Sequence, residues 1–304
     1  MSKKNLIVGQ SGGPTAVINS SLYGVVSEGL RHPEQIQHIY GMVNGIEGFL
    51  AGTVLDFATA LPGSNLEKLK TTPGAYLGSC RYKLPESLED PVYPRLFQKF
   101  REMNIGWFFY IGGNDSMDTV SKLSRYAAQT GSDIRIIGEP KTIDNDLVHT
   151  DHTPGFGSAA RYVASTVREI TTDANVYEKK SVTIVEIMGR HAGWLTAASA
   201  LARKYKGDNP LLIYLPETTF DQEAFLKAVE KSFEKNCNVI VCVSEGIHDA
   251  EGTFICEYDS SVGTDTFGHK MLAGCGKYLE NLVRSRLGVK ARSVELNVSQ
   301  RCSS

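Results

Sequence analysis

Short apolar runs that alternate with amphipathic stretches are the feature of this 304-residue sequence that most constrains its fold. The runs contain little polar alternation, which is typical of parallel strands covered by helices on both faces. The expected strands are Asn5–Gly9, Gly106–Ile111, Ile134–Gly138, Val182–Ile187, Leu211–Leu215 and Val239–Val243. The pattern therefore predicts an α/β protein with mainly parallel sheets.

Helical periodicity fills the stretches between these runs. Apolar residues at spacings of three and four lie on one face of a helix, which then packs on the sheet. Such residues are Ile18, Leu22, Val25 and Val26, then Val163, Val167 and Ile170, and, less regularly, Phe225, Ala228 and Phe233. A chain of 304 residues exceeds the usual size of one compact core, so we expect two lobes.

Composition excludes several classes of protein. The formal net charge is −2 and no basic run stands out, which disfavours nucleic-acid binding. No apolar run approaches the roughly 18 residues of a membrane-spanning helix. The apolar stretch Leu6–Val8 is short and runs into Gly12 and Gly13, so we expect a strand there and not a signal peptide. Six cysteines without CxxC spacing indicate reduced thiols in a cytoplasmic protein.

Two glycine-rich turns follow expected strands. Ser11–Thr15 leads into a helix that we expect to start near Ala16, and Gly112–Ser116 leads into a helix that carries Val120 and Leu123. A glycine turn at a helix N-terminus presents free backbone N–H groups and the positive end of the helix dipole, which suits phosphate. Either turn alone is equally compatible with a plain tight turn.

A loop rich in carboxylates, Pro140–Asp146, follows another expected strand. In an extended stretch, residues two apart point the same way, so we expect Asp144 and Asp146 to face one cleft. Two carboxylates held together repel each other, and a metal ion or a proton transfer relieves that cost. Phosphoryl transfer to a sugar hydroxyl needs a base and a divalent cation, one role for each carboxylate. The alternative is an ordinary acidic turn, which the neighbouring Lys141 and the glycine turns disfavour.

A third turn, Ile187–Arg190, follows the strand expected at Val182–Ile187. It lies where α/β proteins bind ligands, beyond the carboxyl ends of their strands. Arg190 can contact a phosphate or a carboxylate in bidentate fashion. Glu245 has the equivalent position after Val239–Val243. Each residue alone is also compatible with an ordinary surface loop.

Taken together and in order, these turns resemble the phosphofructokinase family over essentially the whole chain. The matching segments are SGGPTAVIN, YGMVNGIEGFL, GAYLGSCRY, GGNDSMDT, PKTIDND, TDHTPGFGSA, EIMGRHAGWLT, SEGI and ARSVELNVSQR. PKTIDND and MGR are the most specific of them, since NAD kinases and lipid kinases share a GGDG-type turn but lack this pair. The resemblance implies two Rossmann-like lobes with a cleft between them. Residues 1–156 would carry the donor site, and residues 157–304, expected to be truncated at the C-terminus, most of the sugar site.

The resemblance also implies roles for individual residues. Asp144 would be the base that accepts the proton of the C1 hydroxyl of fructose 6-phosphate, and Lys141 and Asp115 would complete the catalytic group. Donor-binding residues would be Gly13, Arg81, Gly113 and Ser116. Substrate-binding residues would be Thr142, Ile143, Asp144, Met188, Gly189, Arg190, Glu245, Arg292 and Arg301. Asn114 and Asp146 would bind magnesium (Mg2+), and the protein would be a cytoplasmic homo-oligomer, a dimer or a tetramer.

Two positions bear on the phosphoryl donor. ATP-using members of the family have glycine where this chain has Asp115 and Lys141. A carboxylate at Asp115 repels an α-phosphate and so disfavours ATP. Lys141 supplies a positive charge for pyrophosphate, which has no nucleoside to anchor it. We therefore expect reversible transfer from pyrophosphate to fructose 6-phosphate, giving fructose 1,6-bisphosphate and phosphate.

Two alternatives remain open from the sequence. One is an ATP-dependent phosphofructokinase that tolerates the aspartate of its donor turn. The other is a catalytically silent homologue that binds sugar phosphate as a regulatory subunit. Asn114, Ser181 and Val298, where the family usually has other residues, favour the silent homologue. The presence of Asp144 and Arg190 argues against it.

Overall fold

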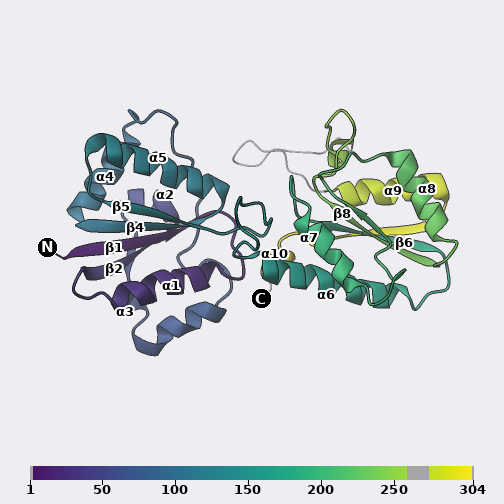
Figure 1. Ribbon diagram of the computed structural model, residues 1–304, viewed down its shortest axis with the longest axis horizontal. Helices are drawn as coiled ribbons and strands as arrows, with labels where there is room; N and C mark the ends of the chain where they lie inside the picture. Colours follow the sequence, from purple (N-terminus) through teal and green to yellow (C-terminus); the bar gives the residue numbers. More distant parts are fainter. Residues whose placement is uncertain (1–2, 259–273, 303–304) are drawn as a thin grey trace. The chain divides into compact units, whose positions relative to one another are not determined.

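The computed structural model describes residues 3–258 and 274–302. The chain divides into two compact units, and the boundary in the sequence falls between Thr142 and Ile143. Each unit has its own sheet with helices packed on it (Figure 1). The predicted α/β class with mainly parallel sheets is therefore confirmed.

The described part of the first unit forms one five-stranded sheet. Its strands are β1 (Lys4–Gln10), β2 (Ile36–Met42), β3 (Val54–Asp56), β4 (Ile105–Gly112) and β5 (Arg135–Pro140). Their order is β3-β2-β1-β4-β5, and only the β2–β3 pair is antiparallel. The carboxyl ends of β1, β4 and β5 therefore lie at one edge of the sheet, which is where the glycine-rich turns begin.

Helices cover both faces of this sheet. They are α1 (Ile18–Leu30), α2 (Gly45–Ala51), α3 (Phe57–Ala60), α4 (Val92–Glu102) and α5 (Asn114–Thr130), with a 3-10 helix η1 at Gly63–Thr71. On one face, α2, α4 and α5 pack around Ile7 and Phe108. On the other face, α1, α3 and η1 pack around Leu6 and Val8. Burial on both faces explains why β1 shows no polar alternation.

Within its described residues, the second unit forms a four-stranded parallel sheet. Its strands, in the order β7-β8-β6-β9, are β6 (Ser181–Ile187), β7 (Leu212–Tyr214), β8 (Asn238–Ser244) and β9 (Lys290–Glu295). The helices are α6 (Phe156–Ala174), α7 (Trp194–Ala198), α8 (Gln222–Ser232), α9 (Cys275–Leu287) and α10 (Ser299–Cys302), with 3-10 turns η2 (Ser199–Ala202) and η3 (Ile255–Tyr258).

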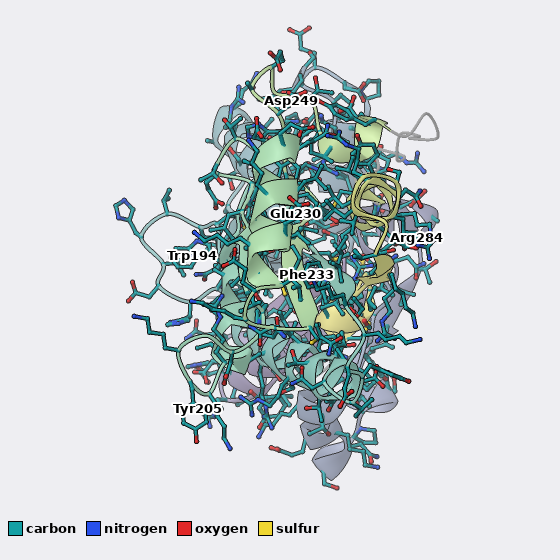
Figure 2. All side chains as sticks on the ribbon, turned by 90° about the vertical axis from the view of Figure 1, so that its right-hand side faces the viewer. Trp194, Tyr205, Glu230, Phe233, Asp249 and Arg284 are labelled. Atoms are coloured by element: carbon teal, nitrogen blue, oxygen red, sulfur yellow. The ribbon has the colours of Figure 1, made fainter. Side chains whose placement is uncertain are left out.

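The helices of the second unit also divide between two faces. Helices α8 and α9, which carry Glu230 and Arg284 (Figure 2), pack against each other and on the face of Val182 and Ile184. Helices α6 and α7 pack on the opposite face, around Ile187. Among the described residues, no helix is long and apolar enough to cross a membrane.

All six expected strands are present, with bounds that differ by one or two residues. Three of the described strands, β2, β3 and β9, are not among these six. β2 has exposed residues at Gln37 and His38, which interrupt its apolar run, and β3 has only three half-buried residues. Of the expected helical faces, Ile18, Leu22 and Val26 are buried, as predicted.

The boundary between the units lies earlier in the chain than residue 156, where we expected it. Ile143 packs with Phe156 in a core cluster of the second unit. The side chain of Asn145 accepts a hydrogen bond from the Thr153 amide (2.9 Å) and donates one to the Asp151 carbonyl (3.1 Å). These contacts place the TIDND loop, after Thr142, with the second unit.

Candidate active site

The first glycine-rich turn follows the carboxyl end of β1. The backbone N–H of Gly12 donates to the carbonyl of Cys80 (3.2 Å), and the hydroxyl of Ser79 donates to the carbonyl of Gly12 (2.7 Å). The amine of Lys141 donates to the carbonyl of Gly13 at 2.5 Å. The turn, the segment that leads to Arg81, and Lys141 are therefore held together within the first unit.

The second glycine-rich turn joins β4 to α5. Helix α5 begins at Asn114, and a Cβ atom on Gly112 would lie 2.0 Å from the hydroxyl of Ser116, so only glycine fits there. The Ser116 hydroxyl is hydrogen-bonded to that of Ser11, which joins the two turns. The backbone N–H of Lys141 donates to the carbonyl of Gly112 (2.9 Å). Strands β1, β4 and β5 thus contribute to one cluster at the sheet edge.

The chemistry of this cluster suits an anion. Helix α5 presents the positive end of its dipole, and its first residues, Asn114 and Asp115, are exposed. Lys141 is only 4% exposed, so its charge lies in a poorly solvated environment where electrostatic interactions are stronger than in water. The expected donor residues Gly13, Arg81, Gly113 and Ser116 all lie in this unit. Their roles remain predictions.

The TIDND loop differs from the extended stretch that we expected. Asn145 has a φ of 57°, in the left-handed region, so side chains two residues apart need not point the same way. Ile143 and Asn145 are buried, Asp144 is half-buried and Asp146 is exposed. The extended geometry that we expected around Asn145 is therefore wrong, and the shared cleft for the two carboxylates stays a prediction.

The MGR turn follows β6 and contacts the end of β8. Gly189 has a φ of 140°, and a Cβ there would lie 2.4 Å from the carbonyl of Ala192. The hydroxyl of Ser244 donates to the carbonyl of Gly189, and the N–H of Glu245 donates to that of Ile187 (2.9 Å). The N–H of Gly189 faces the Glu245 carboxylate at 3.4 Å. The structure therefore brings Met188–Arg190 together with Glu245.

The carboxyl of Glu245 has a raised pKa. Burial, with the negative charges of Glu186 and Asp144, raises its pKa to about 7. The Gly189 N–H and the Arg190 charge act in the opposite direction. Near neutral pH the carboxyl is therefore partly protonated, so it can donate a hydrogen bond as well as accept one.

Glu186, a buried carboxylate on β6, is not among the residues predicted from the sequence. It accepts hydrogen bonds from the backbone N–H groups of Gly274 (3.1 Å) and Gly276 (2.7 Å), at the start of α9. Burial raises its pKa, and the two N–H groups oppose that rise. A charged residue inside the apolar run VTIVEIM was the signal that could have identified it.

Arg301 follows Gln300, a residue that is hydrogen-bonded to the MGR turn. The side chain of Gln300, fully buried on α10, accepts a hydrogen bond from the Met188 N–H (3.2 Å). The Nε of Arg301 is buried and finds no hydrogen-bond partner in the described part of the chain. A buried donor without a protein partner is open to a bound water or anion, and the role of Arg301 in holding the sugar phosphate stays a prediction.

Arg292 is not brought to this turn within the unit. It pairs in register with Thr183, five residues before Met188, which is roughly 16 Å along a strand. Its guanidinium donates to the Thr183 hydroxyl (3.2 Å) and to the carboxylate of Asp173 (3.1 Å), near the end of α6. The contacts of Arg292 inside this chain are thus structural.

The predicted metal ligands lie in different units, Asn114 in the first and Asp146 in the second. Across residues 3–258 and 274–302, no group of three or more His, Cys, Asp or Glu side chains could hold a metal ion. A carboxylate and an amide oxygen are nevertheless ligand types that Mg2+ accepts, usually together with water and substrate phosphates. Each residue has a suitable ligand type by itself, and their joint binding of Mg2+ stays a prediction.

Known proteins are similar to this chain along its whole length. A family model described as Phosphofructokinase matches residues 5–302. The pyrophosphate–fructose 6-phosphate 1-phosphotransferase of Xanthomonas campestris pv. campestris is 44% identical over 293 residues, covering 95% of this chain and 69% of the relative. The ATP-dependent 6-phosphofructokinase 2 of Streptomyces coelicolor is 33% identical over 267 residues, covering 86% and 71%.

A solved structure agrees with these sequence matches. The crystal structure of the pyrophosphate-dependent phosphofructokinase from Marinobacter aquaeolei superposes with a TM-score of 0.85 at 38% identity. The match covers 98% of this chain and 69% of that one. Sequence and fold thus agree over the described residues. This chain belongs to the phosphofructokinase family.

Proposed function

We propose that this enzyme reversibly transfers a phosphoryl group from pyrophosphate to the C1 hydroxyl of fructose 6-phosphate. The products are fructose 1,6-bisphosphate and phosphate. The observation that carries the proposal is the position of Lys141, whose buried amine lies on the carbonyl of Gly13 beside both glycine-rich turns. The pyrophosphate-dependent relative from Xanthomonas is also more similar than the ATP-dependent one, at 44% against 33% identity.

Pyrophosphate must be held by its charges, because it carries no nucleoside. Lys141, Arg81 and the N-terminus of α5 supply positive charge and N–H donors around the two turns. The same groups stabilise the charge that develops on the transferred phosphoryl in the transition state. The exposed carboxylate of Asp115, in the first turn of α5, disfavours a third phosphate at this position.

The second unit supplies the base and the groups that hold the sugar phosphate. Asp144 accepts the proton of the C1 hydroxyl as that oxygen attacks phosphorus. Arg190 and Arg301 offer guanidinium donors to the phosphate of the substrate. Glu245, partly protonated near neutral pH, binds a sugar hydroxyl without adding a full negative charge beside that phosphate.

Asn114 and Asp146 would hold Mg2+ together with the phosphates of the donor. When bound, the ion neutralises charge on the pyrophosphate oxygens. We also propose, from the family resemblance, that the enzyme works in the cytoplasm as a homo-oligomer.

A coupled assay that offers pyrophosphate and ATP separately, with fructose 6-phosphate and Mg2+, tests the donor. We expect turnover with pyrophosphate, and the reverse reaction from fructose 1,6-bisphosphate and phosphate in the same preparation. Turnover with ATP alone would refute the assignment of the donor. Calorimetric binding of fructose 6-phosphate without turnover from either donor would favour the silent homologue.

A further inference from the structure

Two buried amide side chains, Gln10 and Asn19, lie directly behind the first glycine-rich turn. Gln10 is the last residue of β1 and Asn19 the second residue of α1, and both are fully buried. The side-chain nitrogen of Gln10 donates to the side-chain oxygen of Asn19 (3.0 Å) and to the carbonyl of Ile18 (3.2 Å). None of the roles described above uses this pair.

The remaining hydrogen bonds of the pair all go to one segment of the chain. The Leu77 N–H donates to the side chain of Gln10 (2.9 Å), and the Tyr76 N–H donates to that of Asn19 (2.8 Å). The side-chain nitrogen of Asn19 donates to the carbonyls of Thr72 (2.8 Å) and Gly74 (2.7 Å). This segment forms neither helix nor strand, so its backbone polar groups depend on side chains for partners. The side chains of Gln10 and Asn19 thus supply the hydrogen bonds that a helix or a sheet would otherwise give to this backbone.

The same segment continues into the residues that contact the turn. Cys80 and Ser79 bond to the two backbone polar groups of Gly12, at 3.2 Å and 2.7 Å, and Arg81 follows directly. A continuous path of hydrogen bonds therefore leads from Gln10 and Asn19 through residues 72–81 to the turn. The amide type matters, because Asn19 uses both its donors and both its acceptor positions here.

We propose that Gln10 and Asn19 are positioning residues for the phosphoryl donor. They hold residues 72–81 against the first glycine-rich turn, and thereby fix the place of Arg81 relative to Gly12 and Gly13. The pair has no exposed surface, so it acts through this segment and not by contact with a ligand. A fully satisfied buried polar network is rigid, which is what the orientation of a donor requires. The inference rests on the proposed function, which places the donor at this turn.

The test compares Gln10→Met with Asn5→Leu in the intact protein. Gln10→Met keeps the approximate size of the side chain and removes its hydrogen bonds to Ile18, Asn19 and Leu77. We expect the KM for pyrophosphate to rise about tenfold or more, since small misplacements at a site have effects of this size. The KM for fructose 6-phosphate should change less than twofold, and the rise in Tm that pyrophosphate induces should shrink.

Asn5→Leu is the matched control. Asn5 lies at the opposite end of β1, is 8% exposed, and likewise bonds backbone atoms through its side chain, namely the Met103 carbonyl (2.7 Å) and the His38 N–H (3.1 Å). Its replacement should lower Tm and leave both KM values unchanged. A double variant, Gln10→Met with Asn19→Ser, should raise the KM for pyrophosphate by less than the product of the two single effects, since the pair acts as one unit.

Several results would overturn the inference. It fails if Gln10→Met changes both KM values equally or changes neither, or if Asn5→Leu produces the same defect for pyrophosphate. If Gln10→Met does not fold, Asn19→Ser alone gives the same comparison.

Failure of the proposed donor is a separate outcome. If the natural protein uses ATP, Gln10→Met should raise the KM for ATP by a similar factor. If neither donor supports turnover, calorimetry with pyrophosphate should still show weaker binding to Gln10→Met.

Discussion

The pH dependence of stability provides a direct test of the buried acid in the second unit. Burial and the charges of Glu186 and Asp144 raise the pKa of Glu245 from 4.5 to about 7. In the unfolded chain this carboxyl is solvated and titrates near its ordinary value. The folded state thus binds the proton more tightly. Its contribution to stability is complete below pH 4.5 and is lost as the pH rises through about 7.

The size of the effect follows from the difference between the two pKa values. A difference of about 2.5 pH units corresponds to about 3 kcal/mol at 1.36 kcal/mol per unit. Glu245→Gln keeps the shape of the side chain and removes this ionisation. Relative to the variant, the natural protein should therefore lose up to about 3 kcal/mol of unfolding free energy between pH 5 and pH 9.

Urea unfolding at several pH values, together with hydrogen exchange of the β6 and β8 amides, measures this difference in the second unit. Glu230→Gln, at an exposed position on α8 (Figure 2), is the control for the removal of a surface carboxylate from the same unit. A difference between Glu245→Gln and the natural protein that stays constant from pH 5 to pH 9 would refute the reasoning. So would a difference of the opposite sign.

Three further predictions concern the site. Lys141→Gln should lower kcat with pyrophosphate by about 10²–10³-fold, since it removes a charge from a poorly solvated site, while calorimetric binding of fructose 6-phosphate stays within twofold. Gly189→Ala should destabilise the second unit by roughly 1–3 kcal/mol and raise the KM for fructose 6-phosphate, because its φ of 140° and the nearby Ala192 carbonyl leave no room for a methyl group; Gly207→Ala, at a positive φ with open space around it, is the control for backbone strain alone. Chelation by EDTA should abolish turnover and added Mg2+ restore it, whereas unchanged activity would exclude the predicted metal.

The sequence predicted those parts of the fold that burial dictates. β1 and β6 are covered on both faces, so their runs are apolar throughout and easy to identify. β2 could not be identified in this way, because part of it faces solvent and its polar residues break the run. The glycine turns could be placed because they follow strands directly, and parallel strands bring their carboxyl ends to one edge.

The details of the candidate site were less accessible from sequence. The left-handed conformation of Asn145 depends on bonds from its side chain to Asp151 and Thr153, which no local pattern reveals. The pKa of Glu245 depends on its burial and, to a smaller extent, on the charge of Glu186, a residue far away in the sequence. Such properties arise from tertiary packing, whereas local sequence patterns report mainly on periodicity and turns.

The way in which Glu186 caps α9 has a consequence for the order of folding. Gly274, at the start of this helix, has no side chain to cap it. The N–H groups of Gly274 and Gly276 instead donate to the carboxylate of Glu186, which lies 88 residues before Gly274 and 90 before Gly276 in the chain. Loop closure over such a distance costs entropy that local contacts do not repay. We therefore expect the first turn of α9 to become stable only after β6 has joined its sheet, late on the folding pathway of the second unit.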